Sequence, residues 1–166
     1  RTLRGSHNLV FANSRRKVET YADLLRHRCE AEGIANEFWP HHGSLAKHVR
    51  EDTEAALKDK TKPSTAIATS TLELGINVGA VKAVAQVGAA PSVASLRQRL
   101  GRSGRTGGQP RILRGLCIEH PIEADSEISD RLREGLLQLS AQVRLLIGGW
   151  YEPPSQATLQ LSTLIQ

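Results

Sequence analysis

The residues best suited to chemistry lie in one short stretch, QRLGRSGRTGGQP, which runs from Gln98 to Pro110. Its first eleven residues contain three arginines and four glycines. An arginine guanidinium keeps its charge at any working pH and offers a planar fork of N–H donors that matches a phosphate group. Glycine has no Cβ, so its backbone can approach a ligand closely. The stretch therefore indicates a site for a phosphate-bearing ligand.

The charge of the surrounding chain supports the same interpretation. No Asp or Glu occurs between Leu74 and Ile118, where seven side chains are cationic: Lys82, Arg97, Arg99, Arg102, Arg105, Arg111 and Arg114. The whole chain has a net charge of +5, so the remainder carries −2 once this +7 is taken away. Such a local excess favours an anionic partner, either a nucleotide or a nucleic-acid backbone. A solvated basic face is the alternative.

Short apolar runs alternate along the chain with stretches of helical spacing. Strands are predicted at residues 8–13, 36–40, 65–70, 81–88 and 112–119. Helices are predicted from Ser14 to Gly33, from Ser44 to about Lys58, and around residues 95–100. This alternation predicts an α/β domain with a doubly wound parallel sheet and helices on both faces.

The composition changes after His120. Apolar residues then recur along one face of a long amphipathic helix: Ile128, Leu132, Leu136, Leu139, Val143 and Leu146. A glycine pair at 148–149 and a proline pair at 153–154 end that pattern. We expect a domain over residues 1–120, a helical linker over 121–154, and the start of a further domain over 155–166.

Polar segments follow the first three predicted strands: NSRRK, HHGS and TSTLELGIN. In doubly wound sheets, ligands bind at the carboxyl ends of strands. Ser14 can cap the helix that follows it, and the same backbone amides can contact a phosphate. Arg15, Arg16 and Lys17 place cations at the positive end of that helix, which favours an anion there. Long stems that bend outward into water are the alternative.

Several kinds of site are absent from the sequence. The phosphate-binding pattern GxxxxGK[ST] does not occur, and the glycine-rich stretch does not fit GxGxxG. His41, His42 and His48 have no fourth ligand at a suitable spacing, so no metal site is expected. Cys29 and Cys117 lie far apart, which indicates a cytoplasmic protein without a structural disulfide. No apolar run approaches the roughly 20 residues that cross a bilayer, so no membrane partner is expected.

Four segments carry a resemblance to a known family. LVFANSRRKVE, HHGSL, TSTLELGINVG and QRLGRSGR, in this order and each near a strand-to-loop junction, resemble motifs IV, IVa, V and VI of superfamily 2 (DEAD/DEAH-type) helicases. The match covers Asn8 to Ile118 and is most similar to the Lhr type. It implies that residues 1–120 form the second RecA-like domain, and that residues 155–166 begin a winged-helix domain.

The resemblance assigns the arginines to ATP hydrolysis. Arg102 and Arg105 match the arginine fingers of the family, which stabilise the charge of the transferring γ-phosphoryl group. Four further residues match positions around the nucleotide and the interdomain contact: Gly75, Gln98, Gly101 and Gly104. Asn77 stands where the family usually has Asp. Its amide accepts a hydrogen bond without bringing charge, so the change either loosens coupling or is neutral.

A second group of residues matches positions that follow the backbone of a nucleic-acid strand. These residues are Asn13, Ser14, Arg15, Gly43, Ser44 and Thr69. Contacts of this kind are largely independent of sequence and sensitive to salt. Arg99 matches a basic position of less certain role, and we leave it outside the predicted site.

The resemblance implies the second motor domain of an ATP-dependent helicase. Its cofactors would be ATP and Mg²⁺, with the Mg²⁺ ligands and the Walker lysine on a first RecA-like domain of the same chain. We therefore expect these 166 residues alone to be inactive. The nucleic-acid partner would be a single strand, with DNA favoured over RNA. The alternatives are a translocase that does not separate strands, and a non-catalytic nucleic-acid-binding module.

Overall fold

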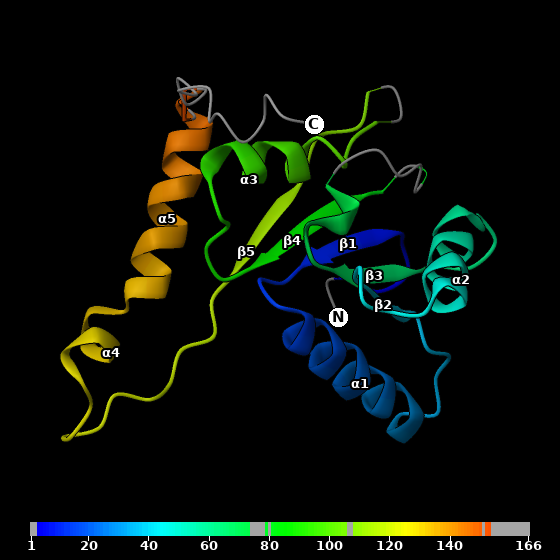
Figure 1. Cartoon of the computed structure of the whole chain (residues 1–166), viewed down its shortest axis with the longest axis horizontal. Helices are drawn as coiled ribbons and strands as arrows, with labels where there is room; N and C mark the ends of the chain where they lie inside the picture. The colour runs from blue at the N-terminus through cyan, green and yellow to red at the C-terminus, as the bar shows by residue number, and fades with distance from the viewer. Residues whose placement is uncertain (1–2, 74–78, 80, 106–107, 151, 154–166) are drawn as a thin grey trace, which may run out of the picture.

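A five-stranded parallel sheet forms the centre of the protein (Figure 1). The structure is a computed structural model that describes residues 3–73, 79, 81–105, 108–150 and 152–153. The strands are β1 (Asn8–Phe11), β2 (Phe38–His41), β3 (Thr65–Ala68), β4 (Ala83–Val87) and β5 (Leu113–Leu116). They lie in the order β2-β3-β1-β4-β5, and each neighbouring pair is parallel. The predicted parallel α/β sheet is confirmed.

Helices cover both faces of this sheet, as predicted (Figure 1). On one face, α1 (Arg15–Ala31) packs Val18 and Ala22 against Val10 of β1. On the other face lie α2 (Lys47–Lys58), the 3-10 helix η1 (Ser70–Leu72) and α3 (Val93–Leu100). Leu57 of α2 and Leu72 of η1 belong to the same buried cluster as Leu9 and Phe11. Because both faces are covered, strands β1 and β3 are wholly buried.

The boundaries of α1 follow from its end residues. The Ser14 hydroxyl accepts a hydrogen bond from the Lys17 amide at 3.2 Å, which caps the first turn. Gly33 has a positive φ of 64° just after the helix, a conformation that glycine adopts without steric cost. Both boundaries were predicted. The predicted cap of α2 was wrong: this helix begins at Lys47, and Ser44 lies in the preceding turn, where the Leu45 amide donates to the His42 carbonyl.

The predicted long helix after residue 120 is two helices, α4 (Ile128–Leu132) and α5 (Glu134–Ile147). Arg133 between them has φ 50° and ψ 50°, a left-handed conformation that ends the first helix. The break gives α5 its own direction, so that Leu139 is buried and its side chain lies against Gly115 of β5. Helix α5 also packs beside α3 (Figure 1). The segment expected to begin a winged-helix domain, residues 155–166, lies outside the described residues.

None of the helices in the described ranges combines the length and the apolar character that a membrane crossing requires.

Candidate nucleotide and nucleic-acid site

The predicted strand-contact residues gather at one edge of the sheet. Phe11 of β1 pairs with Ala68 of β3, which pairs with His41 of β2. The residues that follow these three positions therefore lie together at the carboxyl ends of three adjacent strands. The residues placed there are Asn13, Ser14, Arg15, Gly43, Ser44 and Thr69. Thr69 is half-buried and the other five are exposed. We call this group the strand edge.

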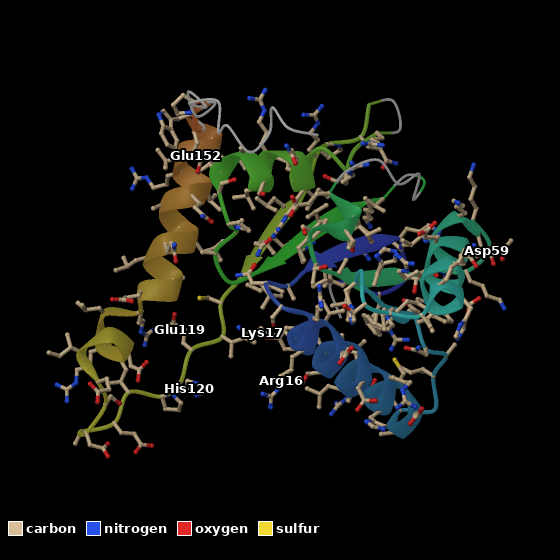
Figure 2. The ribbon with its side chains drawn as sticks, viewed as in Figure 1. Arg16, Lys17, Asp59, Glu119, His120 and Glu152 are labelled. Carbon is tan, nitrogen blue, oxygen red and sulfur yellow. The ribbon has the colours of Figure 1, made fainter. Side chains whose placement is uncertain are left out.

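Backbone hydrogen bonds hold the strand edge together. The Thr69 amide donates to the His41 carbonyl at 3.3 Å, and the Ala12 amide donates to the Ala68 carbonyl at 2.9 Å. The Asn13 side chain is fixed as well, because its Nδ2 donates to the Ala89 carbonyl at 2.7 Å. Arg16 and Lys17, at the start of α1, extend outward from it (Figure 2). The strand edge is therefore a fixed polar surface that includes one cation, Arg15.

His41, at the end of β2 next to the strand edge, is hydrogen-bonded within the fold. His41 Nδ1 lies 2.9 Å from Thr71 Oγ1, and its Nε2 lies 3.4 Å from Glu54 Oε1. Burial lowers the pKa of His41, and the hydrogen bond with Glu54 opposes this effect without cancelling it. Within the described ranges, no group of three or more His, Cys, Asp and Glu side chains could hold a metal ion. His41 therefore helps to position β2 and η1.

The arginine pair lies at the other end of the sheet, on the loop after α3. Ser103 forms a parallel bridge with Val81, which stands just before β4 begins. This loop therefore lies at the amino end of β4, away from the strand edge. The motif that contains it begins inside α3, within the short helix that the sequence predicts around residues 95–100. We call residues 101–105 the finger loop.

The two predicted fingers are held by backbone carbonyls. Arg102 is half-buried, and its Nε donates to the Glu73 carbonyl at 3.0 Å while its Nη2 donates to the same oxygen. Arg105 is exposed, and its Nε donates to the Gly101 carbonyl at 3.1 Å. Burial, followed by the like charge of Arg105, lowers the pKa of Arg102. An anion beside both groups would relieve this repulsion.

Gly104 is essential to the shape of the finger loop. Its φ is 65°, and a Cβ there would lie 2.9 Å from the Gln109 carbonyl oxygen and 3.0 Å from the Arg111 amide nitrogen. Gly101 has an ordinary φ of −63° and ends α3. Gln98 is exposed on the last turn of that helix. The loop can therefore take only glycine at position 104.

Replacing Gly104 by alanine should destabilise the domain by more than the ~1–2 kcal/mol that a left-handed alanine costs, because the backbone contacts add to that strain. Gly108→Ala is the matched control, since Gly108 has φ 81° and nothing within 4 Å of its Cβ position. Urea unfolding of both variants measures the difference in the free energy of unfolding. Equal losses in the two variants would show that the close contacts at Gly104 are unimportant.

A buried ion pair lies directly behind the finger loop. The guanidinium of Arg99 donates to Glu73 Oε1 through Nε at 2.8 Å and through Nη2, and both side chains are buried. The same guanidinium stacks over the Phe11 ring, 4.7 Å from its centroid. The sequence interpretation left Arg99 outside the site. Glu73 is the last acid before the acid-free stretch, so one of the seven cations counted there is neutralised inside the protein.

Comparisons with known proteins identify the family of the chain. Residues 1–107 match the model of a family described as the helicase conserved C-terminal domain. The chain belongs to this family. The resemblance to Lhr-type helicases of superfamily 2 and the RecA-like fold are thereby confirmed.

Individual relatives of this helicase domain carry Lhr names. "Lhr helicase/ probable uracil glycosylase" of Mycolicibacterium smegmatis is 38% identical over 135 residues, which cover 63% of this chain and 9% of the relative. "ATP-dependent helicase Lhr-Core" of Saccharolobus solfataricus is 37% identical over 98 residues, which cover 58% and 11%. The solved structure of Mycobacterium smegmatis helicase Lhr bound to ssDNA and AMP-PNP has a TM-score of 0.72 at 36% identity, over 89% of this chain and 18% of that chain. The match thus spans about a tenth of the length of the curated relatives.

The segment after α5 is hydrogen-bonded to the start of α3, the helix that precedes the finger loop. Figure 2 shows Glu152 beside the start of α3. Its carboxylate accepts hydrogen bonds from the Val93 amide at 2.8 Å and the Ala94 amide at 3.0 Å. The Val93 N–H, followed by the other backbone donors, holds the pKa of Glu152 below its ordinary value. Gln142 of α5 adds a pair of hydrogen bonds to the backbone of Ala90. The linker is therefore bonded to α3.

Gly75 and Asn77, which the resemblance places around the nucleotide, lie outside the described residues. Glu73, just before them, is described and is well fixed. Besides Arg99, its carboxylate accepts a hydrogen bond from the Ser95 hydroxyl at 3.3 Å. Through Glu73, the described part of the segment TSTLELGINVG is therefore hydrogen-bonded to α3.

Proposed function

We propose that this chain is the second motor domain of an Lhr-type ATP-dependent helicase, with Arg102 and Arg105 as its arginine fingers. The observation that carries the proposal is the finger loop itself. It presents a half-buried arginine and an exposed arginine, each held by a backbone carbonyl, on a backbone that only glycine at position 104 permits. In the full-length protein, we assign the Walker lysine to a first RecA-like domain. The division at residues 120 and 154, with a winged-helix domain after it, belongs to the same proposal.

The fingers would act late in the reaction. Phosphoryl transfer spreads negative charge over the γ-phosphate oxygens, and a guanidinium fork placed there stabilises the transition state. Arg102 can exchange the Glu73 carbonyl for a phosphate oxygen, and Arg105 can exchange the Gly101 carbonyl. Gly101 and Gly104 leave room for that approach. Gln98, exposed on α3, would contact the first domain.

Mg²⁺ has no set of ligands in the described part of this chain, because no acidic cluster is present there. When bound with ATP, the ion supplies neutralisation of phosphate charge. We assign its ligands to the first RecA-like domain. Gly75 and Asn77 are proposed to lie near the ribose.

The strand edge is proposed to follow the backbone of single-stranded DNA. Its support is the position of the six residues at the ends of adjacent strands, together with the ssDNA in the related Lhr structure. Ser14 and Thr69 offer hydroxyl groups, and Arg15 offers a charge. We propose a cytoplasmic location for the whole protein.

These 166 residues are expected to show no ATPase activity, with or without single-stranded DNA, because they lack the pattern GxxxxGK[ST]. Phosphate release measures this directly. Turnover at the rate of an intact helicase would contradict the proposal of an incomplete motor.

Binding of a fluorescent DNA strand should be weak and should fall with salt. For three or four phosphate contacts, the affinity should decrease roughly 20- to 50-fold between 50 and 200 mM salt. Arg15→Gln should lower the slope of log K against log salt by about 0.7. Arg26→Gln, which removes the same charge from the same helix beside Asp23 and Glu30, should leave the slope unchanged. Tight binding without salt dependence would favour the non-catalytic binding module.

A further inference from the structure

A set of hydrogen bonds, buried at its centre and part-buried at its two ends, joins the strand edge to the finger loop. Asn13 lies at the carboxyl end of β1, and Arg102 lies near the amino end of β4. Three residues connect them: Gln86 of β4, Arg99 of α3 and Glu73 after η1. They belong to three separate elements, so the connection exists only in the folded protein.

Gln86 is the middle of this connection. Its side chain is fully buried, and its Nε2 donates to Asn13 Oδ1 at 3.3 Å and to the Val87 carbonyl at 3.2 Å. Its Oε1 accepts a hydrogen bond from Arg99 Nη1. The two partners fix the amide in one orientation, because the oxygen must face the guanidinium and the NH₂ group must face Asn13.

Arg99 and Glu73 continue the connection to the finger. The carboxylate of Glu73 is bonded by Arg99, whereas its backbone carbonyl is bonded by Arg102. Arg99 and Arg102 therefore hold the same residue, one through its side chain and the other through its backbone. On the other side, Asn13 is fixed by the Ala89 carbonyl and stands exposed at the strand edge. A ligand that contacts the Asn13 side chain would either weaken or strengthen the hydrogen bond that Asn13 Oδ1 accepts from Gln86.

Burial makes this network sensitive to its end groups. A buried ion pair adds little to stability compared with apolar residues of the same size, so its presence is better explained by the specific arrangement that it enforces. A buried amide that loses one partner has no water to replace it. The network therefore has few arrangements that satisfy every donor and acceptor, and a change at Asn13 is passed to Arg99.

We propose that Gln86 is a positioning residue that couples strand contact at Asn13 to the placement of the finger Arg102, through Arg99 and Glu73. This inference rests on the proposed function, because it requires a strand at Asn13 and a nucleotide at Arg102. It adds a residue that contacts neither ligand and lies outside the four motifs.

The test uses the full-length protein and the variant Gln86→Glu. The new carboxylate keeps an oxygen acceptor for Arg99 and removes the donor to Asn13. We expect the ratio of ATP turnover with saturating single-stranded DNA to turnover without it to fall about 5- to 150-fold, the usual range of coupling between sites. Turnover without DNA and the Kd for DNA should both stay within about 2-fold, because Gln86 reaches neither ligand.

Asn8→Asp is the matched control. Asn8 is a buried amide at the opposite end of β1, where its Nδ2 donates to the Leu3 and Ser6 carbonyls. The same change from amide to carboxylate should lower the melting temperature and leave the stimulation ratio unchanged. If Asn8→Asp lowered that ratio as much as Gln86→Glu, a general loss of packing would explain both results and the proposal would be overturned.

Asn13→Ala supplies a second variant at an exposed position. At saturating DNA it should lower the stimulation ratio by the same factor as Gln86→Glu, and the double variant should show no further loss. Additive losses would overturn the connection. Full stimulation in Gln86→Glu would overturn it too, while leaving the motor function of the wild-type protein intact. A wild-type protein that DNA does not stimulate would instead contradict the proposed function itself.

Discussion

Replacing Arg102 by alanine in the full-length protein is expected to lower DNA-stimulated ATP turnover by about 10³-fold. Binding of ATP and of DNA should change far less, because a finger meets charge that develops only as the γ-phosphoryl group transfers. A 10³-fold loss corresponds to about 4 kcal/mol, whereas an exposed surface charge contributes about 1 kcal/mol or less. Steady-state kinetics and separate binding measurements distinguish these effects.

Two further variants sharpen this test. Arg102→Lys should recover little turnover, because a single ammonium cannot reproduce the planar fork. Arg105→Ala should show a loss of the same kind as Arg102→Ala. The control is Arg114→Ala, which removes an exposed cation of the same acid-free stretch from β5. Near-normal turnover with reduced DNA affinity in Arg102→Ala would identify the loop as a nucleic-acid-binding patch and would contradict the finger assignment.

Glu73→Gln should destabilise the domain by about 3–5 kcal/mol, because it leaves the buried guanidinium of Arg99 without its counter-charge. The double variant Glu73→Leu with Arg99→Met should recover most of that loss, since it removes both charges and keeps the volume apolar. Denaturant unfolding of these 166 residues gives both values.

The control for this prediction is an exposed ion pair. On the surface of α2, Glu51 Oε1 lies 3.6 Å from Lys47 Nζ. Glu51→Gln should change the free energy of unfolding by less than about 1 kcal/mol. If Glu73→Gln had an equally small effect, the buried pair would not hold the finger loop in the way described.

Much of the fold could be predicted because it depends on local patterns. Apolar runs of strand length identified all five strands, and their alternation with helices identified the parallel sheet. Ser14 and Gly33 mark the ends of α1 through their own side-chain and backbone chemistry. The N-cap of α2 is Ala46, which has no side-chain oxygen to mark the position, so α2 was predicted to begin too early, at Ser44. The periodicity of side chains likewise contains no information on the left-handed backbone of Arg133.

From the sequence, only exposed and half-buried residues could be proposed for the site. The motifs place the strand-edge residues and the two predicted finger arginines by residue type and order along the chain, and their roles stay predictions. Arg99 resembles its neighbours in sequence, and its pairing with Glu73 depends on a contact between residues 26 positions apart. Gln86 and Asn13 are 73 positions apart, so their hydrogen bond appears only once β1 and β4 are adjacent. Counting charge along the chain therefore overestimates the number of cations available to a ligand.

The most direct test of the central claim is a structure of the full-length protein with a non-hydrolysable ATP analogue and single-stranded DNA. The account predicts that the Arg102 and Arg105 guanidinium groups leave the Glu73 and Gly101 carbonyls. Each should then lie within hydrogen-bonding distance, about 3 Å, of a γ-phosphate oxygen. Arginines that contact the DNA backbone instead, or that keep their present carbonyl partners with the nucleotide bound in a closed cleft, would contradict it.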